Sequence, residues 1–335
     1  MSKIPLNPFS DRKKPILIDV TLRDGGYLND WNFNERQIQT AISAAGNLGA
    51  DIIEIGYLDN EPGLPVTASW PPDFFDTIMH LKNGFLFAAM VRPSVKDAKN
   101  VLRSRKDTID LVRIPVDLRN TDPANRLSEL CSESGMCFTF NLTSVSCYTD
   151  SQIGDAVRSL NPEAAAVYIA DSRGALLPDD VRRIVSIVKN NRAGLTGYHA
   201  HNNLGLAYQN TKEALLSGCK LIDGSLCGIG LGGRNLNLSE AIDLAKEYRT
   251  DWLQRDGTIP ISEEMLGVPK VSDESIIYHL SGERNIKMEW IQLMIDQLGV
   301  ETTKLIVDRI PRSNYYYEEE LKPYIEKKYW DRIQW

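Results

Sequence analysis

The hydrophobic pattern of the chain switches repeatedly between two periods. Short runs rich in Ile, Val, Leu and Phe alternate with longer segments in which apolar residues recur every three or four positions. The short runs predict buried strands, and the longer segments predict amphipathic helices. The predicted strands are Ile16–Val20, Asp51–Ile55, Phe85–Met90, Ile109–Ile114, Cys137–Leu142, Ala166–Ala170, Thr196–His199 and Leu221–Gly224. The predicted helices are Glu35–Leu48, Phe74–Leu81, Ser94–Ser104, Ala124–Ser134, Gln152–Ser159, Pro178–Asn190, Tyr208–Leu216 and an eighth that begins near Asn237 and includes Glu240–Tyr248.

Eight strands that alternate with helices predict one parallel sheet, because each helix returns the chain to the start of the next strand. Eight such units within about 250 residues are what a closed barrel requires, so we expect an α/β fold of the (β/α)8 TIM-barrel class. We place this barrel at residues 16–255, after a leader of residues 1–15. Residues 256–335 predict a C-terminal helical extension that serves as a lid, a dimer arm or a docking surface.

The composition narrows the class of partner. The 335 residues carry a net charge of −7, which argues against nucleic acid or an anionic membrane as the main partner. No apolar run approaches the roughly 18 residues that a membrane-spanning helix needs, and residues 1–14 lack the apolar stretch of a secretory signal. The five cysteines form no Cys-x-x-Cys pair. We therefore expect a cytoplasmic protein with reduced thiols and no disulfide framework.

Two of the four histidines stand together in His199-Ala200-His201, at the end of the seventh predicted strand. Because side chains alternate along a strand, both imidazoles lie on one face. Asp24 follows the first predicted strand, and two glycines after it permit a sharp turn. Catalytic groups of a barrel lie at the carboxyl ends of its strands, so Asp24, His199 and His201 predict a three-ligand site for a divalent metal. The alternative is two core histidines and a loop-capping aspartate.

Arg23 directly precedes Asp24. By strand alternation it shares a face with Asp19 and Thr21, and a buried arginine needs a partner. That partner is either Asp19, in a structural ion pair, or an oxygen of an anionic substrate. A fixed guanidinium suits the second role, because it stabilises the developing charge of an enolate.

A glycine-rich segment, Gly228–Asn235, follows the eighth predicted strand. It closes the last strand–helix unit instead of opening one, so it does not match a dinucleotide-binding fingerprint. Its glycines, Gly230 among them, predict a close approach of the backbone to a metal-bound substrate. Asn235 either orients a ligand or a metal-bound water, or caps the helix that follows.

Further polar side chains stand at the ends of the other predicted strands. Together they predict a polar, anion-binding pocket at the mouth of the barrel, although each one alone would also fit an ion pair that closes the barrel. We expect Arg113 and Asn141 to contact the substrate. Cys227 lies near the same mouth, but no adjacent base marks it as a nucleophile. The polar side chains at the ends of these strands are Glu54, Tyr57, Arg92, Arg113, Asn141, Asp171, Ser172 and Arg173.

Three of these motifs together resemble the DRE-TIM metallolyase family, and within it they look most like the 4-hydroxy-2-oxovalerate aldolases. The resemblance covers residues 16–250 in order and spacing. The matching pieces are Asp19-x-Thr21-Leu22-Arg23-Asp24-Gly25, then His199-x-His201-Asn202, then Gly228-x-Gly230 running to Asn235.

The resemblance implies a lyase that cleaves or forms a carbon–carbon bond between the enolate of a pyruvate-type 2-oxo acid and an aldehyde. It implies Mn²⁺ or Mg²⁺ held by Asp24, His199 and His201, and an Arg23 that stabilises the enolate. In these aldolases a histidine three residues after the metal aspartate resembles the general base, whereas this chain has Tyr27 there. An ordinary phenol has a pKa of about 10 and is a poor base. The metal and Arg23 therefore lower that pKa, or Tyr27 acts as a proton donor instead.

The expected small-molecule partners are the 2-oxo acid and the aldehyde, and we expect a homodimer. The family aldolases also pair with an aldehyde dehydrogenase through a C-terminal helical region, an interface that does not map onto residues 260–335.

Three other functions fit parts of the pattern. A Claisen-type acyl-CoA lyase or synthase of the same superfamily would need a CoA site, for which the sequence has no clear basic cluster. Two histidines and a carboxylate also suit the Fe(II) of an oxygenase, although such sites usually lie in β-sandwich folds. A barrel that has lost its base would serve as a binding or scaffold protein.

Overall fold

Eight parallel strands close into one barrel, in the order β1 to β8 along the chain, in a computed structural model of the protein. The structure describes residue 9 and residues 14–248, 260–269 and 274–335. The predicted (β/α)8 fold class is confirmed. The strands are β1 (Ile16–Asp19), β2 (Ile52–Tyr57), β3 (Leu86–Met90), β4 (Leu111–Val116), β5 (Cys137–Leu142), β6 (Ala166–Asp171), β7 (Leu195–Ala200) and β8 (Leu221–Gly224).

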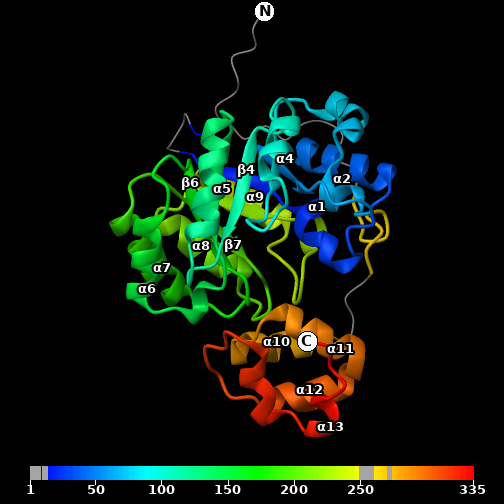
Figure 1. Cartoon of the computed structure of the whole chain (residues 1–335), viewed down its shortest axis with the longest axis vertical. Helices are drawn as coiled ribbons and strands as arrows, with labels where there is room; N and C mark the ends of the chain where they lie inside the picture. The colour runs from blue at the N-terminus through cyan, green and yellow to red at the C-terminus, as the bar shows by residue number, and fades with distance from the viewer. Residues whose placement is uncertain (1–8, 10–13, 249–259, 270–273) are drawn as a thin grey trace, which may run out of the picture.

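Helices surround the barrel and cover the outer face of its strands, except that α1 lies at the end of the barrel nearest the C-terminal helices (Figure 1). They are α1 (Thr21–Asp24), α2 (Glu35–Leu48), α3 (Val66–Ser69), α4 (Ala98–Arg105), α5 (Asp122–Glu133), α6 (Asp150–Ser159), α7 (Pro178–Asn191), α8 (Ala207–Leu216) and α9 (Leu238–Lys246). The α-helix predicted at residues 74–81 is wrong, because this segment forms two 3-10 turns, η2 (Pro72–Thr77) and η3 (Met79–Leu81). Its buried residues Phe75 and Ile78 lie three positions apart, which is the period of a 3-10 helix.

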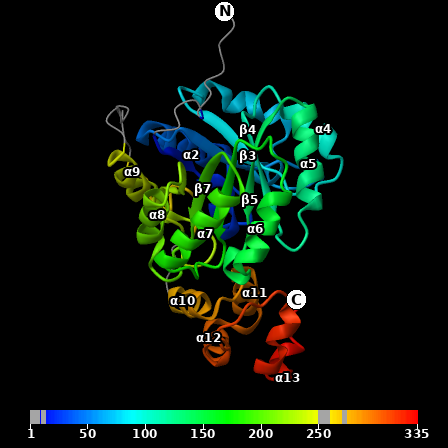
Figure 2. The same ribbon diagram turned by 90° about the vertical axis from the view of Figure 1, so that its left-hand side faces the viewer.

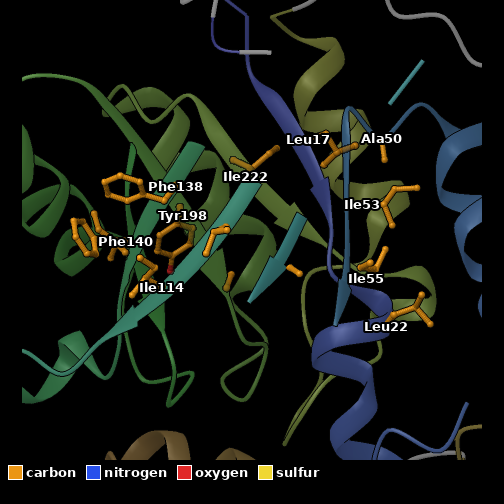
Figure 3. Close-up of a cluster of buried hydrophobic side chains, with 14 of the residues drawn as sticks. Leu17, Leu22, Ala50, Ile53, Ile55, Ile114, Phe138, Phe140, Tyr198 and Ile222 are labelled. Carbon is orange, nitrogen blue, oxygen red and sulfur yellow. The ribbon is translucent and has the colours of Figure 1, made fainter. Parts of the chain in front are cut away.

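The strands carry two separate apolar layers. Residues such as Leu17, Ile53 and Ile222 point outward and pack under the helices (Figure 3). Their neighbours Ile18 and Ile52 point inward and join an apolar plug inside the barrel. This division follows from the period of two along each strand. The plug leaves the carboxyl ends of the strands free for polar groups.

A second helical unit lies at one end of the barrel, on the side away from the N-terminus (Figures 1 and 2). It has an apolar core of its own, built around Ile277, Ile291, Met294 and Ile306. The predicted boundary at residues 255 and 256, and most of the predicted leader, lie outside the described residues. The elements are α10 (Ser275–Arg284), α11 (Met288–Leu298), α12 (Val300–Arg309), η6 (Glu318–Tyr324) and α13 (Lys327–Trp330). Within the described residues, no helix is long and apolar enough to cross a membrane.

Asp19 is a fully buried carboxyl inside the barrel, where it accepts hydrogen bonds from the backbone N–H and the hydroxyl of Thr21. Burial, reinforced by the nearby carboxylates of Glu54 and Asp223, raises the pKa of Asp19 to about 7, whereas in the unfolded chain it is close to 4. The folded protein therefore holds a proton between these pH values that the unfolded chain has lost, so its stability falls as pH rises through this window.

Asp19→Asn is expected to remove this loss of stability at higher pH. Between pH 5 and 7 the unfolding free energy of the wild type should fall relative to the variant by about 1 kcal/mol per pH unit. Urea denaturation of both proteins at the two pH values measures the difference. Parallel pH dependences in the two proteins would show that Asp19 does not hold the proton.

Candidate metal centre and active site

Three predicted ligand residues meet at the carboxyl end of the barrel. The rings of His199 and His201 lie edge to face, with centroids 4.9 Å apart. Their Nε2 atoms are 3.3 Å apart, and each lies 3.9 Å from Oδ2 of Asp24. All three residues are buried, and their ligand atoms lie within 4.8 Å of one another. They form a possible metal site.

The hydrogen bonds of the two imidazoles test whether a metal fits. Nδ1 of His199 lies 3.0 Å from Oδ2 of Asp223, and Nδ1 of His201 lies 3.2 Å from the carbonyl oxygen of Leu231. Both partners are acceptors, so each ring carries its proton on Nδ1 and directs the Nε2 lone pair toward the other ring. Burial lowers the pKa of His201 to about 4. Two facing lone pairs repel unless a cation lies between them, so these residues fit a divalent ion.

Asp24 reaches the site from a helical turn, where an extended strand tip was predicted. Strand β1 ends at Asp19, whose side chain binds the backbone of Thr21, and the N–H of Asp24 donates to the carbonyl of Val20 at 2.8 Å. Strand alternation therefore does not apply to Arg23. Of its two suggested partners, Asp19 is wrong, because the ion pairs of Arg23 are with Asp24 and Glu54. Although burial opposes ionisation, Arg23 and the two imidazoles hold the pKa of Asp24 well below its usual range.

Asn235 positions Asp24. Its Nδ2 donates to Oδ2 of Asp24 at 2.6 Å and to the carbonyl of Ile229 at 3.2 Å. The predicted capping role is wrong, because Asn237 caps α9 by accepting from the N–H of Ser239. A Cβ on Gly230 would lie 2.4 Å from Nδ2 of Asn235. Gly230 thus makes room for this side chain.

Arg23 begins a line of alternating charges that runs through the barrel. Its Nε donates to Oε2 of Glu54 at 2.9 Å, and its Nη1 pairs with Asp24. Arg113 donates to the same oxygen of Glu54 at 2.9 Å and to Oδ2 of Asp223 at 2.7 Å. Asp223 in turn contacts His199. The line therefore fixes both Arg23 and the imidazole of His199 through one continuous network.

Arg113 does not border the cavity, contrary to the expectation that it contacts the substrate. It is the third residue of β4, fully buried, with its guanidinium 4.4 Å from the centroid of the Tyr168 ring. Both of its paired carboxylates belong to the barrel interior. Asp223 was not identified from the sequence as part of the site. Its position inside the predicted strand Leu221–Gly224, where a charged residue needs a partner, could have indicated it.

A cavity of about 850 Å³ opens above the possible metal site. Several predicted residues border it, whereas Arg113, Gly230 and Asn235 do not. The C-terminal helices supply Lys287, Met288 and Glu289 to its wall, and no feature of the sequence had indicated these three. The predicted residues at the cavity are Arg23, Asp24, Tyr27, Tyr57, Arg92, Asn141, Ser172, His199 and His201.

Tyr27 lies at the cavity on the 3-10 turn η1 (Gly25–Leu28), with its hydroxyl 3.2 Å from that of Tyr57. Burial, Tyr57 and Glu289 raise the pKa of Tyr27 well above its ordinary value. The phenol is therefore protonated at neutral pH. The other two histidines lie away from the cavity wall: His80 is exposed, and His279 contacts the carbonyl of Asn203 and lies 3.6 Å from Glu283.

Comparisons with known proteins find a matching family model, similar sequences and a similar solved structure. Residues 129–254 match the family model described as HMGL-like. A 4-hydroxy-2-oxovalerate aldolase of Thermomicrobium roseum is 29% identical over 226 residues, which cover 66% of this chain and 64% of that enzyme. An oxaloacetate decarboxylase of Mycobacterium tuberculosis is 23% identical over 313 residues, covering 88% of this chain and 90% of that protein. A solved N-terminal domain from Bacteroides vulgatus gives a TM-score of 0.67 at 23% identity, covering 86% of this chain and 99% of that domain.

The sequence matches confirm the predicted resemblance to the DRE-TIM metallolyases. The aligned region spans just under two thirds of the first aldolase relative, 64% of its length. The solved domain supports the fold alone.

Proposed function

We propose that this chain, which resembles the DRE-TIM metallolyases, is a divalent-metal-dependent aldolase acting on a pyruvate-type 2-oxo acid and an aldehyde. The observation that carries the proposal is the convergence of two kinds of group on one cavity. Asp24, His199 and His201 offer three metal ligands, and Arg23 offers a fixed cation beside them. The relatives named 4-hydroxy-2-oxovalerate aldolase support the substrate class.

The metal that we propose is Mn²⁺ or Mg²⁺, held by Asp24, His199 and His201. When bound, such an ion supplies a Lewis acid that polarises the keto group of the 2-oxo acid. The protein holds the two imidazoles in the required tautomer through Asp223 and the carbonyl of Leu231.

Arg23 stabilises the enolate oxygen in this proposal. Glu54 and Asp24 fix its Nε and Nη1, whereas its Nη2 has no hydrogen-bond partner among the residues that the structure describes. The side chain borders the cavity and is otherwise buried. A donor that is held in place before charge develops lowers the barrier without having to reorganise.

Tyr27 serves as a proton donor. In the condensation direction, C3 of the enolate bonds to the carbonyl carbon of the aldehyde, and the carbonyl oxygen gains an electron pair and takes a proton. A phenol that stays protonated suits this step, and the contact with the Tyr57 hydroxyl gives a route for its reprotonation.

A second candidate is decarboxylation of oxaloacetate, which also leaves a pyruvate enolate when the C3–C4 bond breaks and CO₂ departs. This reaction takes no proton from a 4-hydroxyl group. It is favoured by the absence of a histidine base from the described cavity wall, apart from the two metal-ligand candidates. The relative named oxaloacetate decarboxylase makes it a specific alternative.

Tyr27→Phe separates the two candidates. Aldol condensation should fall by about 100-fold or more, in line with the loss of a general acid, while oxaloacetate decarboxylation should stay within about twofold. Pyruvate consumption with aldehydes and pyruvate formation from oxaloacetate measure the two rates on the same protein. Undiminished condensation in Tyr27→Phe would remove Tyr27 from the mechanism.

A separate assay tests the Claisen-type alternative. Release of CoA from acyl-CoA donors by the wild-type protein would favour that function.

A further inference from the structure

The cavity is much larger than a three-carbon 2-oxo acid requires. Its volume of about 850 Å³ lies near the top of the range of roughly 300–1,000 Å³ that holds drug-sized ligands. Polar side chains continue along its wall beyond the possible metal site. They include Arg92, Asn120, Asn141, Thr143, Ser172 and Lys287.

Arg92 is a cation without a counter-ion among the residues that the structure describes. It follows β3, and its guanidinium lies 3.7 Å from the centroid of the Tyr57 ring and 5.9 Å from that of Trp31. Its guanidinium makes no ion pair or hydrogen bond with any described residue, and only its backbone carbonyl accepts, from the N–H of Val95. Stacking on an aromatic face orients the planar group and leaves its N–H edge free to donate. The residue therefore presents an oriented donor edge to a ligand.

Lys287 is the second such cation, and it comes from the C-terminal helices. Its ammonium lies 5.9 Å from the centroid of Trp290, and it too lacks an ion pair with the described part of the chain. Buried hydrogen bonds from the barrel hold the segment that carries Lys287. Arg173 donates to the carbonyl oxygen of Asn285 at 2.5 Å and to that of Tyr315 at 2.6 Å. Asn285 stands two residues before Lys287 and also bonds Ser146 of the barrel at 2.7 Å.

None of the described acids at the cavity forms an ion pair with these two cations. Asp24 pairs with Arg23, and Asp117 forms an ion pair with Arg119 at 2.6 Å. Glu289 is exposed and makes no ion pair with a described residue. Asn141 adds a neutral donor, because it is buried at the cavity wall and its Nδ2 has no described partner.

We propose that Arg92 and Lys287 form a subsite for an anionic group on the acceptor aldehyde. The substrate class is a hydroxylated aldehyde that ends in a phosphate or a carboxylate, with Asn141 and the wall hydroxyls binding its hydroxyl groups. The assignment of this ligand as the acceptor rests on the proposed aldolase function. The subsite itself rests on the two unpaired cations and the size of the cavity.

Binding of non-reacting probes tests the subsite directly. Glycerol 3-phosphate, glycerate and glycerol are titrated by NMR into the full chain loaded with Mg²⁺ and pyruvate. An anionic probe should bind at least tenfold more tightly than glycerol, and the stronger of the two identifies phosphate or carboxylate as the group. Arg92→Ala and Lys287→Ala should each weaken that probe about tenfold and leave glycerol unchanged.

Lys96→Ala is the matched control, since Lys96 is exposed, follows Arg92 closely and does not border the cavity. Equal affinities for the anionic probes and glycerol, or an equal loss in Lys96→Ala, would overturn the subsite. In turnover, glyceraldehyde 3-phosphate or an aldehyde with a terminal carboxylate should exceed glyceraldehyde in kcat/KM at least tenfold in the wild type and in Lys96→Ala, but not in Arg92→Ala or Lys287→Ala. If the anionic probes bind through Arg92 and Lys287 but no aldehyde reacts, the aldolase function fails and the subsite stands.

Discussion

Replacing His199 by alanine is expected to remove the bound metal and to abolish turnover, while the barrel stays folded. The variant keeps only two of the three ligand residues. The loss should exceed the roughly 10- to 100-fold that removal of an outer partner of a metal ligand costs. The fold should survive because Asp223, which loses its contact with His199, remains paired with Arg113. Elemental analysis after dialysis against Mn²⁺, together with circular dichroism, measures both effects.

Asp24→Asn should behave in the same way, because a neutral amide is a weaker metal ligand than a carboxylate. His80→Ala is the matched control, since His80 is exposed on η3 and lies away from the cavity. Full metal occupancy in His199→Ala or in Asp24→Asn would contradict the ligand assignment.

Arg23→Ala is expected to lower kcat by about 100- to 1,000-fold, the usual cost of losing one oxyanion donor, and to change KM little. The reason is that the Nη2 contact with the substrate oxygen strengthens as negative charge develops. Steady-state kinetics with the 2-oxo acid substrate separate the two constants. A rise in KM at unchanged kcat would show that Arg23 binds the ground state only.

Arg23 also touches Asp24 and Glu54, so its variant needs a structural readout as well. Metal occupancy should stay near that of the wild type, because Asn235 still holds Asp24 and Arg113 still pairs with Glu54. Arg182→Ala is the control for removing an arginine from an ion pair away from the cavity. A loss of metal in Arg23→Ala would assign it a positioning role instead.

Local rules explain why much of the fold was predictable. Helix α2 matches its predicted range because Asn34 and Gln37 cap its start and Gly49, at a φ of 100°, ends it. The period of two along a strand placed His199 and His201 on one face, which the edge-to-face rings bear out. These signals lie within a few residues of the positions that they determine.

The parts that were missed depend on depth and on contacts between distant segments. Arg113 lies one residue before the predicted end of its strand, so it was grouped with the residues of the mouth. Its place as the third residue of β4 puts it inside the barrel. Gly230 and Asn235 act on Asp24, more than 200 residues earlier in the chain. Lys287 reaches the cavity only because Arg173 binds the carbonyls of Asn285 and Tyr315, and no local pattern encodes that docking.

The most direct test of the proposed function is pyruvate release from 4-hydroxy-2-oxo acids, followed with lactate dehydrogenase in the presence of Mn²⁺ and after metal removal. The substrates carry at C4 either a short aliphatic group or a hydroxylated, anionic one. We predict release that requires the metal, that is greatest for the anionic substrate and that is lost in Asp24→Asn. Absence of release from every 4-hydroxy-2-oxo acid, together with metal-dependent decarboxylation of oxaloacetate, would contradict the aldolase assignment.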